Sequence, residues 1–323
     1  MADDGLTGTG KAARRARAVA AGAALGSCVL LMASVTPAAA HGGESGHGGG
    51  AGHGSSGHGR GHGYGGGAAH GPRYVALGDS YTSGPGILPQ TDANCARSAR
   101  NYPSLVAERT KASVFEDVSC GGATTEQMWT AQGTNPPQLR ALGRDTGLVT
   151  LQIGGNDIGF GSIIATCAGL GVQDPAGGPC RNHYTSSGTD RLTEAVAETA
   201  PKIERVLRAV HARSPHARVL VVGYPDLLPD DGSGCFPAVP FAAGDFPYLR
   251  DTEKRLNAML RAVAVRNRAE YVDTYGPTVG RDMCKAPEDR WIEPLVPASP
   301  AAPAHPNAKG EQAMATAVLN RLR

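Results

Sequence analysis

Short apolar runs recur along the chain from residue 74 onward, and they restrict the folds that it can adopt. They are rich in Val, Leu and Ile and lie at residues 74–77, 114–118, 148–153, 219–223 and 270–272. Several of them lack the polar alternation of a half-exposed strand, which predicts strands that are covered on both faces. The sequence therefore predicts a central sheet with other elements packed on both of its sides.

Segments with helical spacing of apolar residues lie between and after these runs. The clearest covers residues 190–214, where Leu192, Val196, Ile203 and Val210 share one side and charged residues occupy the other. Two more helices are expected at 248–267 and 307–323. Because strands that alternate with helices imply right-handed crossovers, we predict an α/β sandwich around a mostly parallel sheet.

The first 40 residues have the order of a secretory signal peptide. Basic residues at 11–17 precede an apolar run at 18–35 and the small residues up to Ala40, after which we predict cleavage. Two alternatives are a membrane anchor formed by the apolar run, and a lipoprotein cleavage site at LGSC, residues 25–28. We expect a secreted, extracellular protein.

Residues 41–71 are rich in His and Gly and contain six of the ten histidines of the chain. This composition is too polar and too flexible to bury a core, so we predict a disordered arm followed by a folded domain at 72–323. A solvated spacer is the simplest interpretation of the arm. Because repeated His-Gly can also bind transition metals, a secreted metal-binding protein that acts through the arm is an alternative.

Six cysteines remain after removal of the predicted signal peptide: Cys95, Cys120, Cys167, Cys180, Cys235 and Cys284. An even number in an exported chain favours disulfides, and the spacing does not match the paired Cys-x-x-Cys of a zinc site. Sequential pairing is the simplest choice. Charge excludes one class of partner: 31 basic residues nearly balance 29 acidic ones, so we expect no nucleic acid to bind.

Reactive side chains follow the predicted strands, at the edge where parallel sheets gather their functional groups. The stretches are Gly78-Asp79-Ser80, Cys120-Gly121-Gly122-Ala123-Thr124, Gly154-Gly155-Asn156-Asp157 and, before the last helix, Ala304-His305-Pro306-Asn307. Acyl transfer to a serine requires a base for its proton and donors aimed at the oxygen that becomes negative. Ser80 and His305 fit the first requirement. The N–H groups of Ser80 and Gly122 and the Asn156 amide fit the second.

Each of these residues has a plainer interpretation when it is taken alone. Ser80 could cap a helix, Asn156 could be a turn residue, and His305 could be a surface side chain. We interpret Asp79 and Asp157 as hydrogen-bond acceptors that hold loops rather than as metal ligands, and we expect neither a metal nor another cofactor. The joint occurrence of the four stretches favours catalysis.

The four stretches together resemble the GDSL or SGNH hydrolase family, in its secreted bacterial lipase and esterase branch. GDSYTSG, CGGATT, IGGND and HPNAKG appear in the family's order, and the resemblance covers residues 73–323. It implies a flavodoxin-like three-layer sandwich with about five parallel strands. It also implies Ser80 as nucleophile, His305 as general base, and an oxyanion hole of Ser80, Gly122 and Asn156, with Gly121 as the alternative to Gly122.

The chain departs from the family pattern at one position. Members commonly carry an acid three residues before the histidine, where this chain has Ala302. We therefore predict a Ser-His dyad in which a backbone carbonyl near Ala302 accepts the imidazole N–H. The implied activity is hydrolysis of lipid-like or aryl esters, phospholipids included, through an acyl-enzyme. A carbohydrate acetyl esterase and a non-catalytic binding module on the same fold are alternatives.

Aromatic residues near the predicted site are expected to contact the acyl part of the substrate. Phe236, Phe241 and Phe246 share one loop region, and Trp291 shortly precedes His305. For the three phenylalanines, packing of that loop onto the sheet is the alternative. The expected partners are an ester substrate and, transiently, lipid surfaces, and we expect a monomer.

Overall fold

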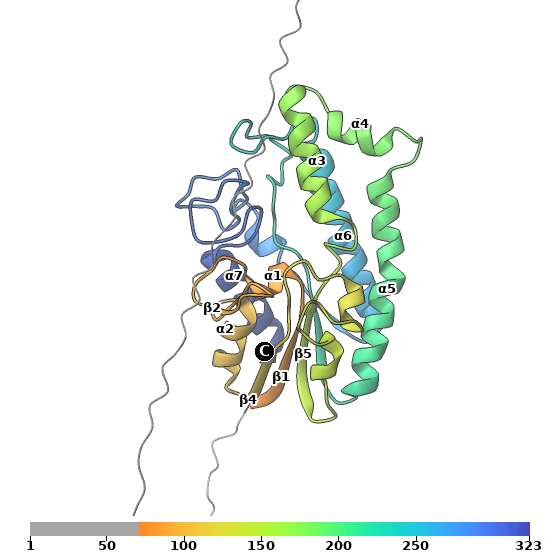
Figure 1. Cartoon of the computed structure of the whole chain (residues 1–323), viewed down its shortest axis with the longest axis vertical. Coiled ribbons are helices and arrows are strands. Elements are labelled where there is room, and N and C mark those ends of the chain that lie inside the picture. Colours follow the sequence, from red (N-terminus) through yellow and green to blue (C-terminus); the bar gives the residue numbers. More distant parts are fainter. Residues whose placement is uncertain (1–70) are drawn as a thin grey trace, which may run out of the picture. The chain divides into compact units, whose positions relative to one another are not determined.

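The computed structural model describes residues 71–323, which contain a five-stranded sheet (Figure 1). The strand order is β4-β1-β5-β6-β7, and all neighbouring strands are parallel. The strands are β1 (Gly71–Gly78), β4 (Ala112–Asp117), β5 (Thr146–Gln152), β6 (Arg218–Val222) and β7 (Glu270–Val272). Each predicted apolar run overlaps one of them, which confirms the predicted fold class. The predicted signal peptide and all but the last residue of the predicted arm lie outside the described residues.

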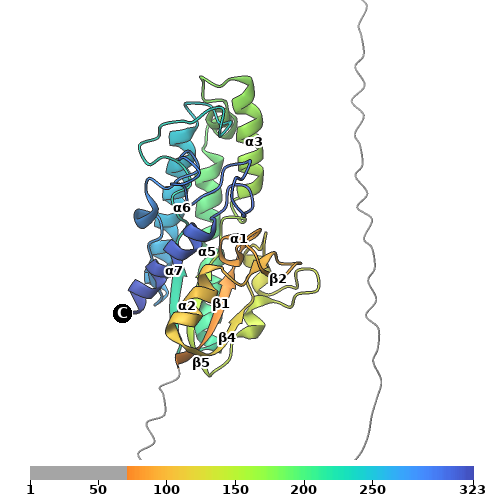
Figure 2. The same cartoon turned by 90° about the vertical axis from the view of Figure 1, so that its left-hand side faces the viewer.

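Both faces of the sheet are buried because side chains along each strand alternate between two apolar clusters. In β1, Tyr74 and Ala76 belong to one cluster, while Val75 and Leu77 belong to the other. Helices α2 (Tyr102–Thr110) and α7 (Ala308–Leu322) complete the first cluster and lie side by side (Figure 2). Helices α5 (Arg191–Arg213) and α6 (Phe246–Arg266) complete the second, so the domain is a three-layer sandwich.

The three predicted helices correspond to α5, α6 and α7, with ends that differ by one or two residues. Several short elements were not predicted: α1 (Ser80–Ser83), β2 (Gln90–Asp92), β3 (Arg97–Ser98), α4 (Pro179–Thr185), η1 (Thr125–Met128), η2 (Gln138–Ala141) and η3 (Gly276–Thr278). These elements are too short for a periodic spacing of apolar residues to be recognised in the sequence. Helix α3 (Phe160–Gln173) was also missed, because its three glycines and few polar residues leave no clear apolar side.

Three disulfides hold the loops around the sheet. They join Cys95 to Cys120, Cys167 to Cys180 and Cys235 to Cys284, which is the sequential pairing. The last bridge connects the loop after β6 to the loop after β7, at the edge where the strands end. None of the helices within 71–323 combines the length and the apolar character needed to cross a membrane.

Candidate active site

Ser80 is separated from the end of β1 by Asp79 alone and is the first residue of the short helix α1. Asp79 caps this helix, because its carboxylate accepts a hydrogen bond from the Tyr81 N–H at 2.9 Å. The alternative interpretation, in which Ser80 is itself the cap, therefore does not hold. The Ser80 hydroxyl is left available to a partner outside its own turn.

The turn between β1 and α1 is tight enough to require glycine at position 78. A Cβ atom at Gly78 would lie 2.1 Å from the Thr82 Oγ1 atom. The buried side chain of Gln138 accepts from the Gly78 N–H at 2.8 Å and donates to its carbonyl at 2.9 Å. These contacts hold the residues that precede Ser80 in one position.

His305 reaches Ser80 from the loop that leads into α7. Its Nε2 atom lies 2.7 Å from the Ser80 Oγ atom, and its Nδ1 atom lies 2.7 Å from the Pro303 carbonyl oxygen. Because a carbonyl can only accept, Nδ1 carries the proton and Nε2 is the acceptor for the serine hydroxyl. The carbonyl of Pro303, one residue beyond Ala302, thus takes the place of the missing acid.

The imidazole of His305 is enclosed by aromatic rings that also fix its loop. The Tyr81 ring lies 4.8 Å from the imidazole centre, and the Phe160 ring meets it edge-on at 6.0 Å. The Tyr81 hydroxyl donates to the Ala304 carbonyl at 2.6 Å. Ala304 has a φ of 58°, a left-handed conformation that is unfavourable for alanine, so this buried hydrogen bond stabilises a strained turn beside the histidine.

Three N–H donors gather beside the Ser80 hydroxyl. Ser80, Gly122 and Asn156 line the same open hollow as His305. The N–H groups of Ser80 and Gly122 have no protein acceptor among residues 71–323. Asn156 uses one amide hydrogen to donate to the Ala123 carbonyl at 2.9 Å, which orients the other. Free, oriented donors of this kind can stabilise a negatively charged oxygen.

The structure distinguishes Gly122 from its neighbour Gly121. The Gly121 N–H already donates to the Cys95 carbonyl at 2.9 Å, so it cannot also serve a substrate. Gly122 has a φ of 77°, and a Cβ atom there would meet nothing within 4 Å. Glycine is thus favoured at position 122 by its backbone conformation, and the space beside its Cα atom is open.

A buried hydrogen-bond chain connects the serine turn to the asparagine loop. The Tyr224 hydroxyl donates to the Asp79 carboxylate at 2.5 Å and accepts from the Gly155 N–H at 2.8 Å. The side chain of Asn257 holds the backbone of Tyr224 through both its N–H and its carbonyl. Sequence reasoning missed Tyr224 and Asn257, because neither belongs to a recognised motif.

Burial changes the protonation of two groups at the site. It lowers the pKa of His305 below its ordinary value, although the hydrogen bond to Pro303 acts in the opposite direction. The imidazole is therefore neutral, and able to accept a proton, at neutral pH. Burial also raises the pKa of Asp79 to about 7, against the lowering effect of the hydrogen bonds from Tyr224 and Tyr81.

Asp157 holds the segment that follows Gly122. Its carboxylate accepts from the Thr125 N–H at 2.9 Å and from the Thr125 hydroxyl. Within residues 71–323, no three His, Cys, Asp or Glu side chains are grouped to hold a metal ion. Asp79 and Asp157 both act as acceptors that hold loops.

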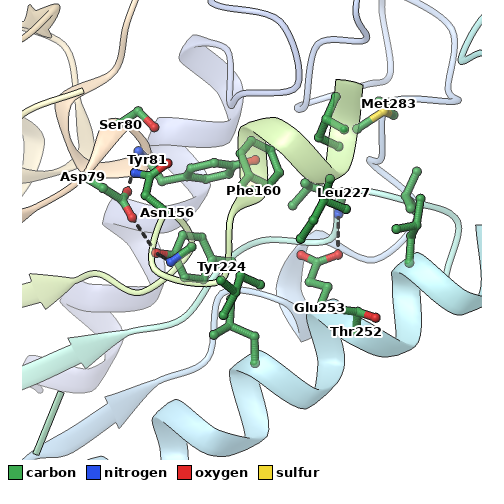
Figure 3. A pocket seen from close by; sticks show the side chains of 17 residues that line it. Asp79, Ser80, Tyr81, Asn156, Phe160, Tyr224, Leu227, Thr252, Glu253 and Met283 are labelled. Carbon is green, nitrogen blue, oxygen red and sulfur yellow. Dashed lines mark hydrogen bonds between the residues drawn. The ribbon is translucent and has the colours of Figure 1, made fainter. Parts of the chain in front are cut away.

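A narrow cavity of about 70 Å³ opens beside Ser80 and passes between α3 and α6 (Figure 3). Most of its lining is apolar and comes from Ile158, Phe160, Ile163, Ile164, Leu227, Leu228, Leu249, Leu256 and Met283. Ser80, Asn156, Phe160 and Ile164 line both this cavity and the open hollow at His305. The Ser80 hydroxyl therefore lies where an apolar cavity and an open hollow meet.

The aromatic residues expected from the sequence do not form this cavity, and that prediction is corrected. Phe241 and Phe246 are fully buried and pack against each other with ring centres 5.7 Å apart. Phe236 is 43% exposed, and it lines neither the cavity nor the hollow. Trp291 borders a separate hollow along α7. The aliphatic residues of α3, α6 and the loop after β6 form the apolar wall instead.

A model of the GDSL-like lipase/acylhydrolase family matches residues 76–313 of the chain. Among characterised proteins, Lipase 2 of Streptomyces coelicolor is 45% identical over 255 residues, which cover 77% of this chain and 85% of that protein. An esterase of Streptomyces scabiei is 32% identical, with the same coverage of both chains.

Two solved structures share the fold over nearly their whole length. Phospholipase A1 from Streptomyces albidoflavus aligns with a TM-score of 0.65 and 28% identity, over 78% of this chain and 99% of that one. An extracellular lipase from Streptomyces rimosus aligns with a TM-score of 0.64 and 27% identity, over 78% of this chain and all of that one.

Proposed function

The chain belongs to the GDSL-like lipase/acylhydrolase family and is a carboxylic ester hydrolase, and we propose that it cleaves esters with a dyad of Ser80 and His305. The observation that carries this proposal is the pair of 2.7 Å contacts that His305 makes, to the Ser80 hydroxyl through Nε2 and to the Pro303 carbonyl through Nδ1. They give the imidazole the tautomer and orientation that a general base requires.

In the first half of the reaction, Ser80 Oγ attacks the ester carbonyl carbon while His305 Nε2 takes the hydroxyl proton. The carbonyl oxygen becomes negative and is stabilised by the N–H groups of Ser80 and Gly122 and by the free amide hydrogen of Asn156. Collapse of this intermediate breaks the bond to the alcohol, which leaves with the proton from His305. The acyl group remains esterified to Ser80.

The second half repeats these steps with water. His305 takes a proton from the water while its oxygen attacks the acyl-enzyme carbonyl, and the same three donors stabilise the second intermediate. Its collapse releases the carboxylic acid and returns the proton to Ser80. No step requires a metal or another cofactor.

We propose that the acyl chain occupies the apolar cavity and that the alcohol part lies in the open hollow at His305. A hydrocarbon chain gains free energy by leaving water for the aliphatic lining, at about 0.8 kcal/mol per buried CH₂ group. A sugar ring would place hydroxyl groups against that lining without partners. The cavity thus favours lipid-like or aryl esters over acetylated carbohydrates, and a phospholipid is within the proposed substrate class.

The first experiment is hydrolysis of p-nitrophenyl esters, from acetyl to palmitoyl, by the wild type and by the variants Ser80→Ala and His305→Ala. Both variants should lose at least about 10³-fold in kcat, because each removes a group that reacts. The controls are Ser187→Ala and His183→Ala, whose side chains are exposed and lie away from the site. Circular dichroism should show that all four variants remain folded.

The outcomes separate the alternatives. Activity that survives in Ser80→Ala would mean that another residue is the nucleophile. A wild type that cleaves only acetyl esters would favour the carbohydrate acetyl esterase. A folded wild type without esterase activity would reject the proposed function and favour a binding role, including metal binding by residues 41–71.

We further propose that the protein is secreted, with residues 1–40 removed, residues 41–71 as a spacer and residues 72–323 as the hydrolase domain. Three disulfides, which persist in oxidising compartments, support export. Intact-mass measurement of the protein from a bacterial culture medium should give a chain that begins at His41 and has no free thiols. Retention of the full-length chain in the cells would contradict this.

We also propose that the protein contacts lipid surfaces transiently and that it is a monomer. Leu295 lines the hollow at His305, and its neighbour Val296 is 82% exposed, which places apolar surface beside the mouth of the site. Co-flotation with phosphatidylcholine vesicles that Val296→Asp weakens would support the lipid contact, and unchanged flotation would argue against it. Sedimentation equilibrium measures the oligomeric state.

A further inference from the structure

One carboxyl group interrupts the apolar lining of the cavity beside Ser80. Glu253 projects from α6 and lines the cavity together with Thr252, Leu249 and Met283. Figure 3 shows Glu253 close to Leu227 and well removed from Ser80, across the row of lining side chains. The group therefore lies where the distal part of an acyl chain would pass, and it takes no part in the proposed reaction.

The carboxyl of Glu253 has one oxygen paired and one oxygen without a partner. Its Oε2 atom accepts from the Leu227 N–H at 3.3 Å. Its Oε1 atom is buried and has no hydrogen-bond partner, and within residues 71–323 the group forms no ion pair with a lysine or arginine side chain. Buried polar atoms are normally paired, so an unpaired one in a ligand cavity suggests that a ligand completes it.

The protonation state determines what Oε1 can offer to a ligand. Burial raises the pKa of Glu253 well above its ordinary value, and the nearby Asp226 raises it further, while the hydrogen bond from Leu227 and the charge of Lys254 act in the opposite direction. Burial therefore favours the neutral, protonated form of the group. In that form Oε2 accepts from Leu227 and the acidic hydrogen lies on Oε1, which can donate it to a ligand atom that reaches Glu253.

This donor makes the cavity discriminate between acyl chains. A plain alkyl chain that reaches Glu253 excludes water and leaves the O–H unpaired, which is unfavourable in an apolar environment. A chain with an oxygen at that depth accepts the hydrogen bond instead. Sites built to bind a substrate oxygen reject analogues that lack it much more strongly than apolar pockets reject an extra methylene group.

We propose that Glu253 is a specificity-determining residue, which makes the acyl cavity prefer chains with a hydroxyl or carbonyl oxygen near Glu253 over plain alkyl chains of the same length. This inference rests on the proposed function of Ser80 and His305, since it assigns the acyl chain to this cavity. The substrate class is therefore esters of oxygenated fatty acids.

The test compares p-nitrophenyl dodecanoate with hydroxydodecanoate esters that carry the hydroxyl at successive carbons. The wild type should favour the hydroxy ester at one or two positions by about tenfold in kcat/KM, the effect of one good hydrogen bond. In Glu253→Leu the ratio should fall to about one, because the unpaired donor is gone. Glu253→Gln keeps a donor of similar shape and should keep part of the preference.

Asp251→Asn is the matched control, because Asp251 lies on the same helix, is 52% exposed and pairs with Arg250 outside the cavity. It removes an acidic charge and should leave the ratio unchanged. Thermal unfolding should show Glu253→Leu to be folded, with a lower melting temperature than the wild type because the Leu227 N–H loses its acceptor. A hydroxy-to-plain ratio that is equal in the wild type and in Glu253→Leu at every position would overturn the proposal.

Hydrolysis of p-nitrophenyl butyrate distinguishes failure of the proposed function from failure of the proposed selectivity. If the wild type does not cleave it, the proposed function itself fails. If the wild type cleaves it and the ratio does not depend on Glu253, only the selectivity is rejected, and Glu253 has a structural role in holding the Leu227 backbone.

Discussion

At the scale of single residues, the proposed base depends on a carbonyl that no side-chain substitution removes. The Pro303 oxygen accepts the Nδ1 hydrogen of His305, so the tautomer is set by the backbone rather than by an acid at position 302. A carbonyl has no full negative charge and stabilises a protonated imidazole less than a carboxylate would. Burial therefore dominates the pKa of His305 and keeps it low.

The pH dependence of the reaction follows from the lowered pKa of His305. His305 accepts a proton only when it is neutral, so kcat/KM should fall as pH decreases through its pKa. Because that pKa is lowered, the midpoint should lie below the ordinary histidine value of about 6.5, with a tenfold loss per unit below it. A pH profile of kcat/KM for a short ester measures this midpoint.

Burial raises the pKa of Asp79 to about 7, close to the range in which His305 titrates. The pH profile therefore needs a control that separates the two groups. Asp79→Asn removes that carboxyl while retaining an acceptor for the Tyr81 N–H. An acidic limb with the same midpoint in this variant would belong to His305. A midpoint above 6.5 in both proteins would contradict a base whose pKa is lowered by burial.

At the scale of elements, the N-terminus of α7 positions the loop that carries His305. Asn307 caps this helix by accepting from the N–H groups of Lys309 and Gly310 at 3.0 and 3.3 Å. Its amide also donates to the buried Glu293 carboxylate at 2.8 Å. His305 lies two residues before this cap, so the start of α7 determines where the imidazole lies.

Asn307→Ala should lower the free energy of unfolding by about 2–4 kcal/mol, from the lost cap and from the lost hydrogen bond to a buried charged group. The value of kcat/KM should also fall, because the loop with His305 loses its anchor. Urea unfolding and ester hydrolysis measure the two effects. The control is Asn320→Ala, which makes the same change at an exposed position of α7. Equal stability of the two variants would argue against the role of the cap.

At the scale of the whole domain, the loops that surround the site are long and depend on covalent links. The bridge between Cys235 and Cys284 closes a loop with a sequence separation of 49 residues and joins segments that follow β6 and β7. Met283, next to this bridge, lines the apolar cavity. Loss of the bridge should therefore affect both stability and the shape of the cavity.

Replacement of both Cys235 and Cys284 by alanine should reduce the free energy of unfolding by about 4 kcal/mol, because the unfolded chain gains the entropy of a loop of this length. The same change at Cys167 and Cys180, which are 13 residues apart, should cost about 3 kcal/mol by the same reasoning. Guanidinium unfolding measures both. Unchanged stability without the longer bridge would contradict this account.

The strands, the long helices and the position of the candidate site could be predicted from the sequence, because each depends on a pattern of neighbouring residues. The strands were recognised because both of their faces are buried, which produces continuous apolar runs, and the long helices because their apolar residues return at a helical period. Parallel strands place their carboxyl ends at one edge. The residues after them, including Ser80, Gly122 and Asn156, could therefore be assigned to one site, and a family resemblance implied the roles that we propose for them.

Only the tertiary structure decided which residues complete that site. Tyr224 reaches Asp79 across 145 positions, the Pro303 carbonyl replaces an expected acid, and Glu253 faces a cavity that no motif marks. The same holds for the phenylalanines, which were expected at the substrate and are found in the core or away from the site. Local sequence patterns report which side of an element is buried. They do not report which distant side chain fills the space against it, because that depends on how the layers pack together.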